Sequence, residues 1–247
     1  MINLKNSAEI GMMRKSGQVL RDLLLYLEEK VRPGISTKKL DEFAYDYIKR
    51  HGGTPSFLGY GGFPASICTS VDEVVVHGIP GHRRLEEGQI VGIDAGVILN
   101  GWQSDAARTL FVGEVSEEKR RLVETTRESF FEGVKHFVEG GRLGDISQAI
   151  QDYNESRGYG IVRDLVGHGI GRKMHEDPAV PNFGVAGHGV RLQKGLVLAI
   201  EPMVNMGTWK VRTLDDEWTC VTADGKPSAH YENTVALTEN GTEILTL

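Results

Sequence analysis

The stretch "IVGIDAGVILNGWQSDAARTLFVG", residues 90–113, carries two aspartates in a largely apolar segment and decides how the middle of the chain folds. Asn100-Gly101 at its centre is the strongest short signal for a two-residue hairpin turn, because both positions tolerate positive φ. With that turn, Gly96 faces Asp105, and side-chain alternation puts Asp94 on the same face. The two aspartates are then diagonal neighbours, roughly 7–8 Å apart between backbones.

A carboxylate in an apolar strand is costly to bury, so it is usually neutralised, paired or bound to a metal. Because Gly96 has no side chain, we expect open space between Asp94 and Asp105, which would suit a cation. The alternative is that Asp105 caps a loop and Asp94 pairs with an arginine. The hairpin alone does not decide between them.

Composition narrows the class of protein. The chain has 247 residues, a net charge of −6 and no basic cluster, which argues against sequence-specific contacts to nucleic acid. We find no signal-peptide core and no membrane-spanning run, and therefore expect a cytoplasmic protein. Cys68 and Cys220 are too few for a disulfide framework or a cysteine-based zinc site, and we expect both to be buried.

The two halves of the chain resemble each other. Helical periodicity predicts a helix over residues 7–31, capped by Ser7, and a second that ends at Gly52. Ser116 then opens another long helix, and residues 148–158 form a shorter one, at an offset of 110 residues. This predicts a single catalytic domain, residues 1–247, with pseudo-symmetric halves of about 1–113 and 114–247. A site between such halves would be natural.

Further polar residues lie on strand-like segments of the second half. The glycines around His168 and His175 in "VGHGIGRKMHEDP" disfavour a helix, so this segment is not the zinc motif in which two histidines share one face of a helix. Glu201 ends an apolar strand. The segment "AHYENTVALTENG" reads as one alternating strand with Glu232 in it. Each acid alone could be an ordinary paired residue.

Taken together, these residues indicate a metal site. The set is rich in oxygen and too negative for one divalent ion, so it suits two ions bridged by carboxylates at roughly 3.5–4 Å. Hard oxygen ligands with one imidazole favour Mn, Fe(II) or Co, with Zn as a further candidate. Its five members are Asp94, Asp105, His168, Glu201 and Glu232.

Six motifs in order make the chain resemble the type I methionine aminopeptidases of the short bacterial form. They are "DEVVVHGIP", "IDAGV", "SDAARTLFVG", "GHGIGRKMHE", "AIEPM" and "SAHYENTVALT". The resemblance implies the α+β pita-bread fold, in which two helices plus antiparallel strands are duplicated about a pseudo-twofold axis around a central curved sheet. It also implies removal of the N-terminal methionine when the second residue is small, by attack of a water that bridges two metal ions.

The resemblance further implies roles for residues. Asp94 would bind one ion, Asp105 and Glu232 would bridge both, and His168 and Glu201 would bind the other. Glu201 would also act as general base. His175 would contact the scissile carbonyl and His77 the peptide beyond it. The implied methionine pocket consists of Phe57, Tyr60, Phe63, Cys68, Met174 and Trp218, of which Phe57, Phe63 and Met174 depart from the residues usual in the family.

Partners follow from the same resemblance. A monovalent cation is implied near Asp72, Val74 and Ser228, although Asp72 replaces an asparagine. We expect a monomer that acts on nascent polypeptide N-termini, without membrane contact, and any docking to the ribosome would use the catalytic domain's own surface. The alternatives are an X-Pro peptidase of the prolidase or aminopeptidase P kind, and a non-catalytic binding protein of the same fold.

Overall fold

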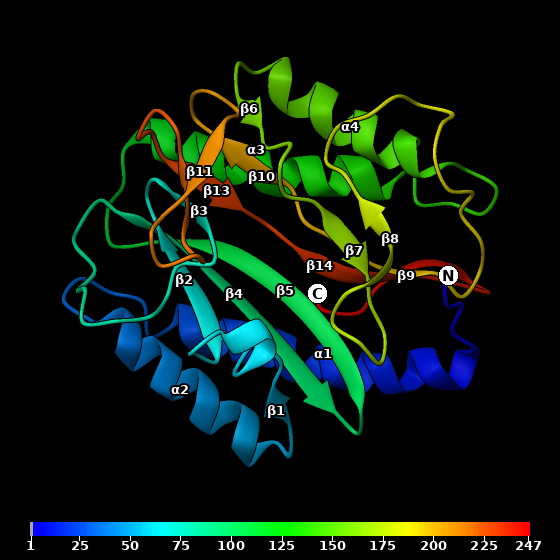
Figure 1. The fold of residues 1–247 in the computed structure, drawn as a ribbon, viewed down its shortest axis with the longest axis horizontal. Coiled ribbons are helices and arrows are strands. Elements are labelled where there is room, and N and C mark those ends of the chain that lie inside the picture. The colour runs from blue at the N-terminus through cyan, green and yellow to red at the C-terminus, as the bar shows by residue number, and fades with distance from the viewer. Residues whose placement is uncertain (1) are drawn as a thin grey trace.

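The computed structural model describes residues 2–247, in which helices border a central set of strands (Figure 1). The helices are α1 Ser7–Glu28, α2 Thr37–Arg50, α3 Glu117–Val134 and α4 Leu143–Glu155, with a short 3₁₀ turn at Tyr60–Gly62. The strands of the first half are β1 Thr54–Pro55, β2 Ile67–Val71, β3 Val74–Val76, β4 Ile90–Leu99 and β5 Trp102–Phe111. Those of the second half are β6 Gly160–Ile161, β7 Gly167–Gly169, β8 Glu176–Val180, β9 Val197–Ile200, β10 Met203–Asn205, β11 Val211–Thr213, β12 Cys220–Thr222, β13 Ser228–His230, β14 Asn233–Thr238 and β15 Gly241–Ile244.

The predicted hairpin is confirmed residue by residue. Leu99 pairs with Trp102 across a turn in which Asn100 and Gly101 both have positive φ, at 52° and 77°. Further along the ladder, Gly96 faces Asp105. Because this register is set by the turn, both aspartates lie on one face of the β4–β5 hairpin.

Helix α1 differs from the sequence prediction at both ends, since it ends at Glu28 rather than at residue 31. The residue that caps α1 is Asn6, not Ser7, since its side chain accepts the Glu9 N–H while the Glu9 carboxylate accepts the Asn6 N–H. This reciprocal pair satisfies two N–H groups that the helix leaves free. Ser116 caps α3 as predicted, through its hydroxyl and the Lys119 N–H.

The fourth helix starts earlier than predicted. It begins at Leu143 rather than at residue 148, because the Asp145 carboxylate accepts the N–H of Arg142 and closes the first turn. Only glycine fits at position 144, because a Cβ there would lie 2.2 Å from the Val185 carbonyl oxygen. Consequently α1 and α3 begin 110 residues apart (7 and 117), whereas α2 and α4 begin 106 apart (37 and 143).

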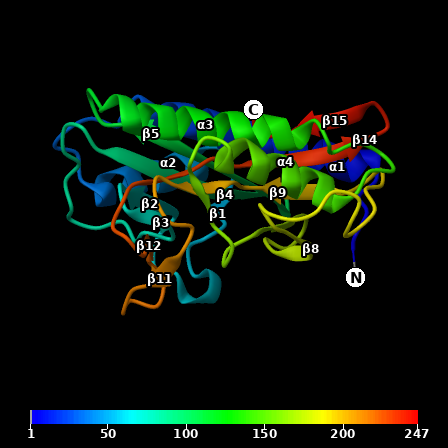
Figure 2. The same cartoon turned by 90° about the horizontal axis from the view of Figure 1, so that it is seen from above.

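The helices of each half pack mainly on strands of the same half, although Ile10 and Met13 of α1 also pack with Val197 and Ala236 of the second half. Leucines of α1 and α2 pack with the apolar residues of β2, β4 and β5, and Phe130, Ile146 and Ile150 of α3 and α4 pack with β9, β10 and β14. Helices and strands form layers in Figure 2, with the loops around β8 and β11 projecting on the side away from α3. None of the helices within residues 2–247 is long and apolar enough to span a bilayer.

The segment predicted as one strand at residues 229–241 is two. β13 pairs with β10, β14 pairs with β9, and Tyr231 and Glu232 lie between them. The partner strands break at the same level, at Glu201 and Pro202, because proline has no N–H to donate to a ladder. The two breaks therefore place Glu201 and Glu232 outside regular pairing, at the centre of the molecule.

Candidate functional site

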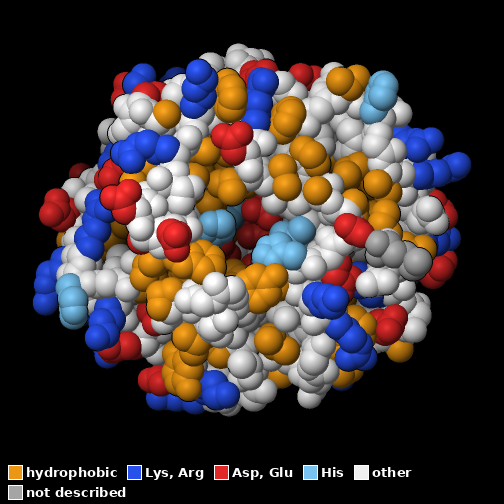
Figure 3. All heavy atoms as spheres, viewed as in Figure 1, with side chains coloured by type: hydrophobic (Ala, Val, Ile, Leu, Met, Phe, Trp, Pro, Cys, Tyr) orange, Lys and Arg blue, Asp and Glu red, His pale blue; other side chains and the backbone are white. Residues whose placement is uncertain are grey.

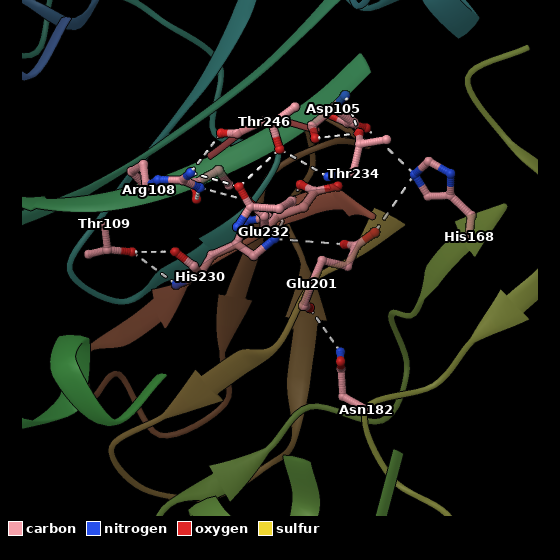
Figure 4. A network of polar contacts seen from close by, with 12 residues as sticks. Asp105, Arg108, Thr109, His168, Asn182, Glu201, His230, Glu232, Thr234 and Thr246 are labelled. Carbon is pink, nitrogen blue, oxygen red and sulfur yellow. Dashed lines mark hydrogen bonds and ion pairs between the residues drawn. The ribbon is translucent and has the colours of Figure 1, made fainter. Parts of the chain in front are cut away.

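The five residues predicted as metal ligands all line one pocket. Figure 4 shows four of them close together, namely Asp105, His168, Glu201 and Glu232. Asp94 and Asp105 come from the hairpin, His168 from β7, and Glu201 and Glu232 from the two strand breaks. Asp105 and Glu232 are buried, while Asp94 and Glu201 keep some exposure to the pocket between the halves.

Strand β5 joins the halves. Ala107 exchanges two backbone hydrogen bonds with Glu232 and faces Asp94 on its other side, so these three residues form a row across the structure. Beside them, the Thr234 hydroxyl accepts the N–H of Asp105 and donates to its carbonyl, at 2.9 and 2.8 Å. A threonine side chain thus replaces a strand partner and fixes the backbone of Asp105.

His168 presents one nitrogen to the carboxylates. Its Nδ1 lies 2.9 Å from the carbonyl of Gly169, which can only accept, so Nδ1 carries the proton. Its Nε2 is therefore a lone-pair donor, 3.5 Å from Asp105 Oδ2 and 3.7 Å from Glu201 Oε1. A histidine whose far N–H is held by a carbonyl is the usual arrangement for a metal ligand.

The cluster brings four carboxyl groups together in a buried position, which favours a bound cation. Burial raises the pKa of Asp105 to about 8, and burial together with the neighbouring carboxylates raises the pKa values of Asp94, Glu201 and Glu232. Within residues 2–247, no hydrogen bond reaches Asp94 Oδ1, Asp105 Oδ1 or Glu232 Oε1. Buried, unpartnered carboxylate oxygens of this kind fit divalent metal ions.

The sequence left open that Asp94 pairs with an arginine, and Arg108 does not form this pair. Arg108, a buried cation nearby, donates to the carbonyls of Ala107 and Glu232 and to the side chain of Asn233. Its guanidinium also lies over the ring of Tyr231. Arg108 thus supports the backbone of Glu232 and leaves the carboxylate of Asp94 to other partners.

A cavity of about 150 Å³ opens directly beside the cluster. Figure 3 shows acidic side chains at the bottom of a hollow that histidines and hydrophobic side chains border. Five of the six residues predicted for a methionine pocket line it, namely Phe57, Tyr60, Phe63, Cys68 and Trp218. Burial raises the pKa of the Cys68 thiol, which therefore serves as an uncharged lining group.

The structure does not bring Met174 into this lining. Met174 is buried and packs over Gly96, where a Cβ would approach its Cε to 2.7 Å. The side chain of Ser56 fills the other part of that space, also at 2.7 Å. The expectation of open space at Gly96 is therefore wrong, since these two side chains occupy it.

Two histidines outside the five also face the cavity. His77 follows β3 with a positive φ of 59°, which an unbranched residue at a functional turn can adopt, and its ring meets the edge of Trp218. The Nδ1 of His175 lies 2.7 Å from the hydroxyl oxygen of Tyr60. Burial, and to a lesser extent His168, lowers the pKa of His175 to about 4.

The residues predicted near a monovalent cation are close together but already paired. The carboxylate of Asp72 is 2.6 Å from Lys119 Nζ, and its carbonyl accepts the N–H of Ser228. Val74 begins β3. The chain's own lysine thus neutralises the aspartate that replaces the expected asparagine.

One site residue was missed from the sequence. His230 is buried beside Glu201 and Glu232, with its Nε2 3.8 and 3.7 Å from their carboxylate oxygens. In the sequence, His230 stands two residues before Glu232, on the same face of the predicted strand. Strand alternation by itself assigns no function to a residue in that position.

Comparison with known proteins identifies the family of the chain. Residues 11–239 match Metallopeptidase family M24. A methionine aminopeptidase from Clostridium perfringens is 60% identical over 100% of this chain and 99% of its own. The crystal structure of methionine aminopeptidase from Rickettsia prowazekii superposes with a TM-score of 0.98 at 39% identity, over all of both chains, and matches the predicted pita-bread fold. A prolidase from Pyrococcus furiosus, at 22% identity and a TM-score of 0.78, shares the fold over 99% of this chain and 65% of that one. The chain belongs to metallopeptidase family M24.

Proposed function

We propose that this chain is a metal-dependent aminopeptidase that removes the N-terminal methionine from peptides. The observation that carries the proposal is the apolar cavity of about 150 Å³ set directly against the cluster of carboxylates and imidazoles. The cavity would hold one side chain, and the cluster would act on the peptide bond that follows it.

The lining of the cavity suits a thioether. Phe63 and Trp218 meet edge to face with ring centroids 5.1 Å apart, and Cys68 lies against them. Aromatic rings and a sulfur atom offer polarisable contacts to a flexible methionine side chain. Because the cluster of carboxylates closes one end of the pocket, a free α-amine would be attracted there, which limits cleavage to the first residue.

Asp94, Asp105, His168, Glu201 and Glu232 would hold the metals, for which we propose two ions of Mn, Fe(II) or Co, with Zn as a further candidate. Such ions would acidify water and polarise a carbonyl oxygen. Glu201, whose pKa is raised mainly by burial, would take up the proton of the attacking water and return it to the leaving amine. His175 would donate from Nε2 to the carbonyl oxygen, and His77 would contact the peptide beyond the cleaved bond.

Further parts of the proposal concern the substrate and its setting. We propose that the natural substrates are nascent polypeptides with a small second residue, processed in the cytoplasm by a monomer, with any ribosome contact made by the domain's own surface. The monovalent cation near Asp72, Val74 and Ser228 stays a prediction.

The test is peptide hydrolysis by chelated protein with each metal added back. We expect release of methionine from Met-Ala-Ser, and none from Ala-Pro-Ala or the dipeptide Met-Pro. N-acetylated Met-Ala-Ser is the matched control, since it keeps every side chain but removes the free amine. Preference for the X-Pro substrates would place the chain with the prolidases, and no cleavage with any metal would favour a binding role.

A further inference from the structure

His230 is a buried histidine beside Glu201 and Glu232 that belongs to none of the five ligands predicted from the sequence. It ends β13 and is only 3% exposed. Within residues 2–247 its Nε2 has no hydrogen-bond partner, although it is fully enclosed. A buried ring nitrogen without a partner is uncommon, because leaving it unsatisfied costs free energy.

The surroundings of this nitrogen are carboxylate oxygens. Nε2 lies 3.7 Å from Glu232 Oε2 and 3.8 Å from Glu201 Oε2, both too long for hydrogen bonds. Metal–ligand bonds of roughly 2.0–2.2 Å place two ligand atoms of one ion roughly 3–3.5 Å apart. The observed separations are close to this spacing, and Figure 4 shows the rings of His230 and His168 on opposite sides of the carboxylates.

The potential ligands divide into two groups that share a member. Asp94, His230 and Glu232 each offer an atom within 4.8 Å of the others, and so do Asp105, His168 and Glu232. Each group therefore contains one aspartate, one imidazole and the shared Glu232. A site for two ions bridged by Glu232 would have this composition, with His230 serving one ion as His168 serves the other.

The backbone of His230 is held in place for such a role. The hydroxyl of Thr109 on β5 accepts the His230 N–H and donates to the His230 carbonyl, both at 2.9 Å. Four residues earlier on the same strand, Asp105 is fixed by the hydroxyl of Thr234 in the same manner. The backbone that carries the imidazole is thus anchored to the strand that carries an aspartate of the cluster.

We propose that Nε2 of His230 is a sixth protein ligand, binding the same divalent ion as Asp94. The proposal rests on the proposed function only in requiring that divalent ions occupy the cluster. A second imidazole adds a nitrogen donor to a ligand set that otherwise consists mostly of oxygen atoms. This favours Fe(II), Co and Zn over Mn for the ion bound by Asp94.

The test counts metal-bound imidazoles in the chain loaded with two equivalents of Co(II). Each histidine bound to cobalt gives one strongly shifted, solvent-exchangeable N–H signal in the proton NMR spectrum. We expect two such signals, one lost in His230→Gln and the other in His168→Gln. The exposed His188→Gln is the matched control and should keep both. Calorimetry should show one of the two cobalt affinities at least about tenfold weaker in His230→Gln.

The outcomes separate this proposal from the function it deepens. A single signal in the unaltered chain that vanishes only in His168→Gln overturns the sixth ligand and leaves the metallopeptidase intact. Two signals that both survive His230→Gln overturn it as well, since another histidine then supplies the second. Absence of any cobalt binding overturns both the sixth ligand and the metal-dependent function. The signal that each variant keeps shows that it still folds and binds cobalt, so the loss of the other signal is specific to the replaced histidine.

Discussion

The hydroxyl oxygen of Tyr60 lies 2.7 Å from Nδ1 of His175, at the mouth of the pocket. Burial lowers the pKa of His175 to about 4, so its ring is neutral near pH 7 and carries a single proton. If the phenol donates to Nδ1, that proton lies on Nε2. In that arrangement Tyr60 selects the tautomer in which His175 can donate to a carbonyl oxygen.

Replacing Tyr60 with phenylalanine removes this hydrogen bond and keeps the ring. We expect kcat on Met-Ala-Ser to fall about fivefold, which corresponds to about 1 kcal/mol for one hydrogen bond. The KM should change little, because the aromatic face that lines the cavity remains. A KM effect with unchanged kcat would instead assign Tyr60 to binding alone.

Removing His175 altogether should have a larger effect on the same step. His175→Ala is expected to fold and to bind metal with unchanged stoichiometry, but to lose about 10²–10³-fold in kcat, as for other donors to a developing oxyanion. Calorimetry with Co(II) and steady-state hydrolysis would be measured on the same preparation. Loss of a metal equivalent in this variant would show that His175 is itself a ligand.

The hairpin shows how much of the site is encoded locally. Asn100-Gly101 sets the register of β4 and β5, and the register alone brings Asp94 and Asp105 to one face. Their proximity could be predicted because two strands and one turn determine it. The remaining predicted ligands were found from single polar residues on apolar strands, and the fold brings all of them together.

What the sequence did not reveal depends on contacts between distant segments. Met174 fills the space over Gly96 because the loop after β7 folds onto β4, and no local pattern encodes that contact. The break between β13 and β14 was invisible because alternation continues through it, while pairing changes from β10 to β9. His230 is held in the cluster by Thr109, 121 residues away, and by its ladder pairing with Met203.

Asp105 is expected to be essential for metal binding. It contributes to one three-residue group with His168 and Glu232, and its Oδ1 has no hydrogen-bond partner within residues 2–247. Asp105→Ala should bind fewer metal equivalents and lose roughly 10³-fold or more in activity, since several kcal/mol of Lewis-acid stabilisation depend on the ions. An active, fully metal-loaded Asp105→Ala protein would refute the assignment.

The chelated protein should become less stable as pH rises. Burial raises the pKa of Asp105 to about 8, above its value of about 4 in the unfolded chain, so the folded state binds the extra proton in this window. The stabilisation is complete below about pH 4 and is lost as pH approaches 8. Metal ions compete with those protons, so the loaded protein should show the opposite trend.

Thermal unfolding between pH 5 and pH 8 measures this dependence, with and without chelator. Asp105→Asn is the matched control, because an amide cannot titrate and should flatten the decline of the chelated protein. A melting temperature of the chelated wild type that rises with pH relative to this control would contradict the raised pKa of Asp105.

Gly96 is expected to tolerate no side chain. A Cβ at this position would lie 2.7 Å from both Met174 Cε and Ser56 Cβ, and Met174 and Ser56 are buried. We expect Gly96→Ala to lower the free energy of unfolding by about 1–3 kcal/mol, the usual cost of overpacking, and to weaken cobalt binding because Gly96 pairs with Asp105. The control is Gly92→Ala on the same strand, where a Cβ would meet its nearest neighbours at 3.5 Å, an ordinary contact distance. Denaturant unfolding of both variants decides the matter: equal effects would mean that the strand resists any alanine, whereas a loss confined to Gly96→Ala would locate the constraint in the packing of Met174 and Ser56 behind the metal ligands.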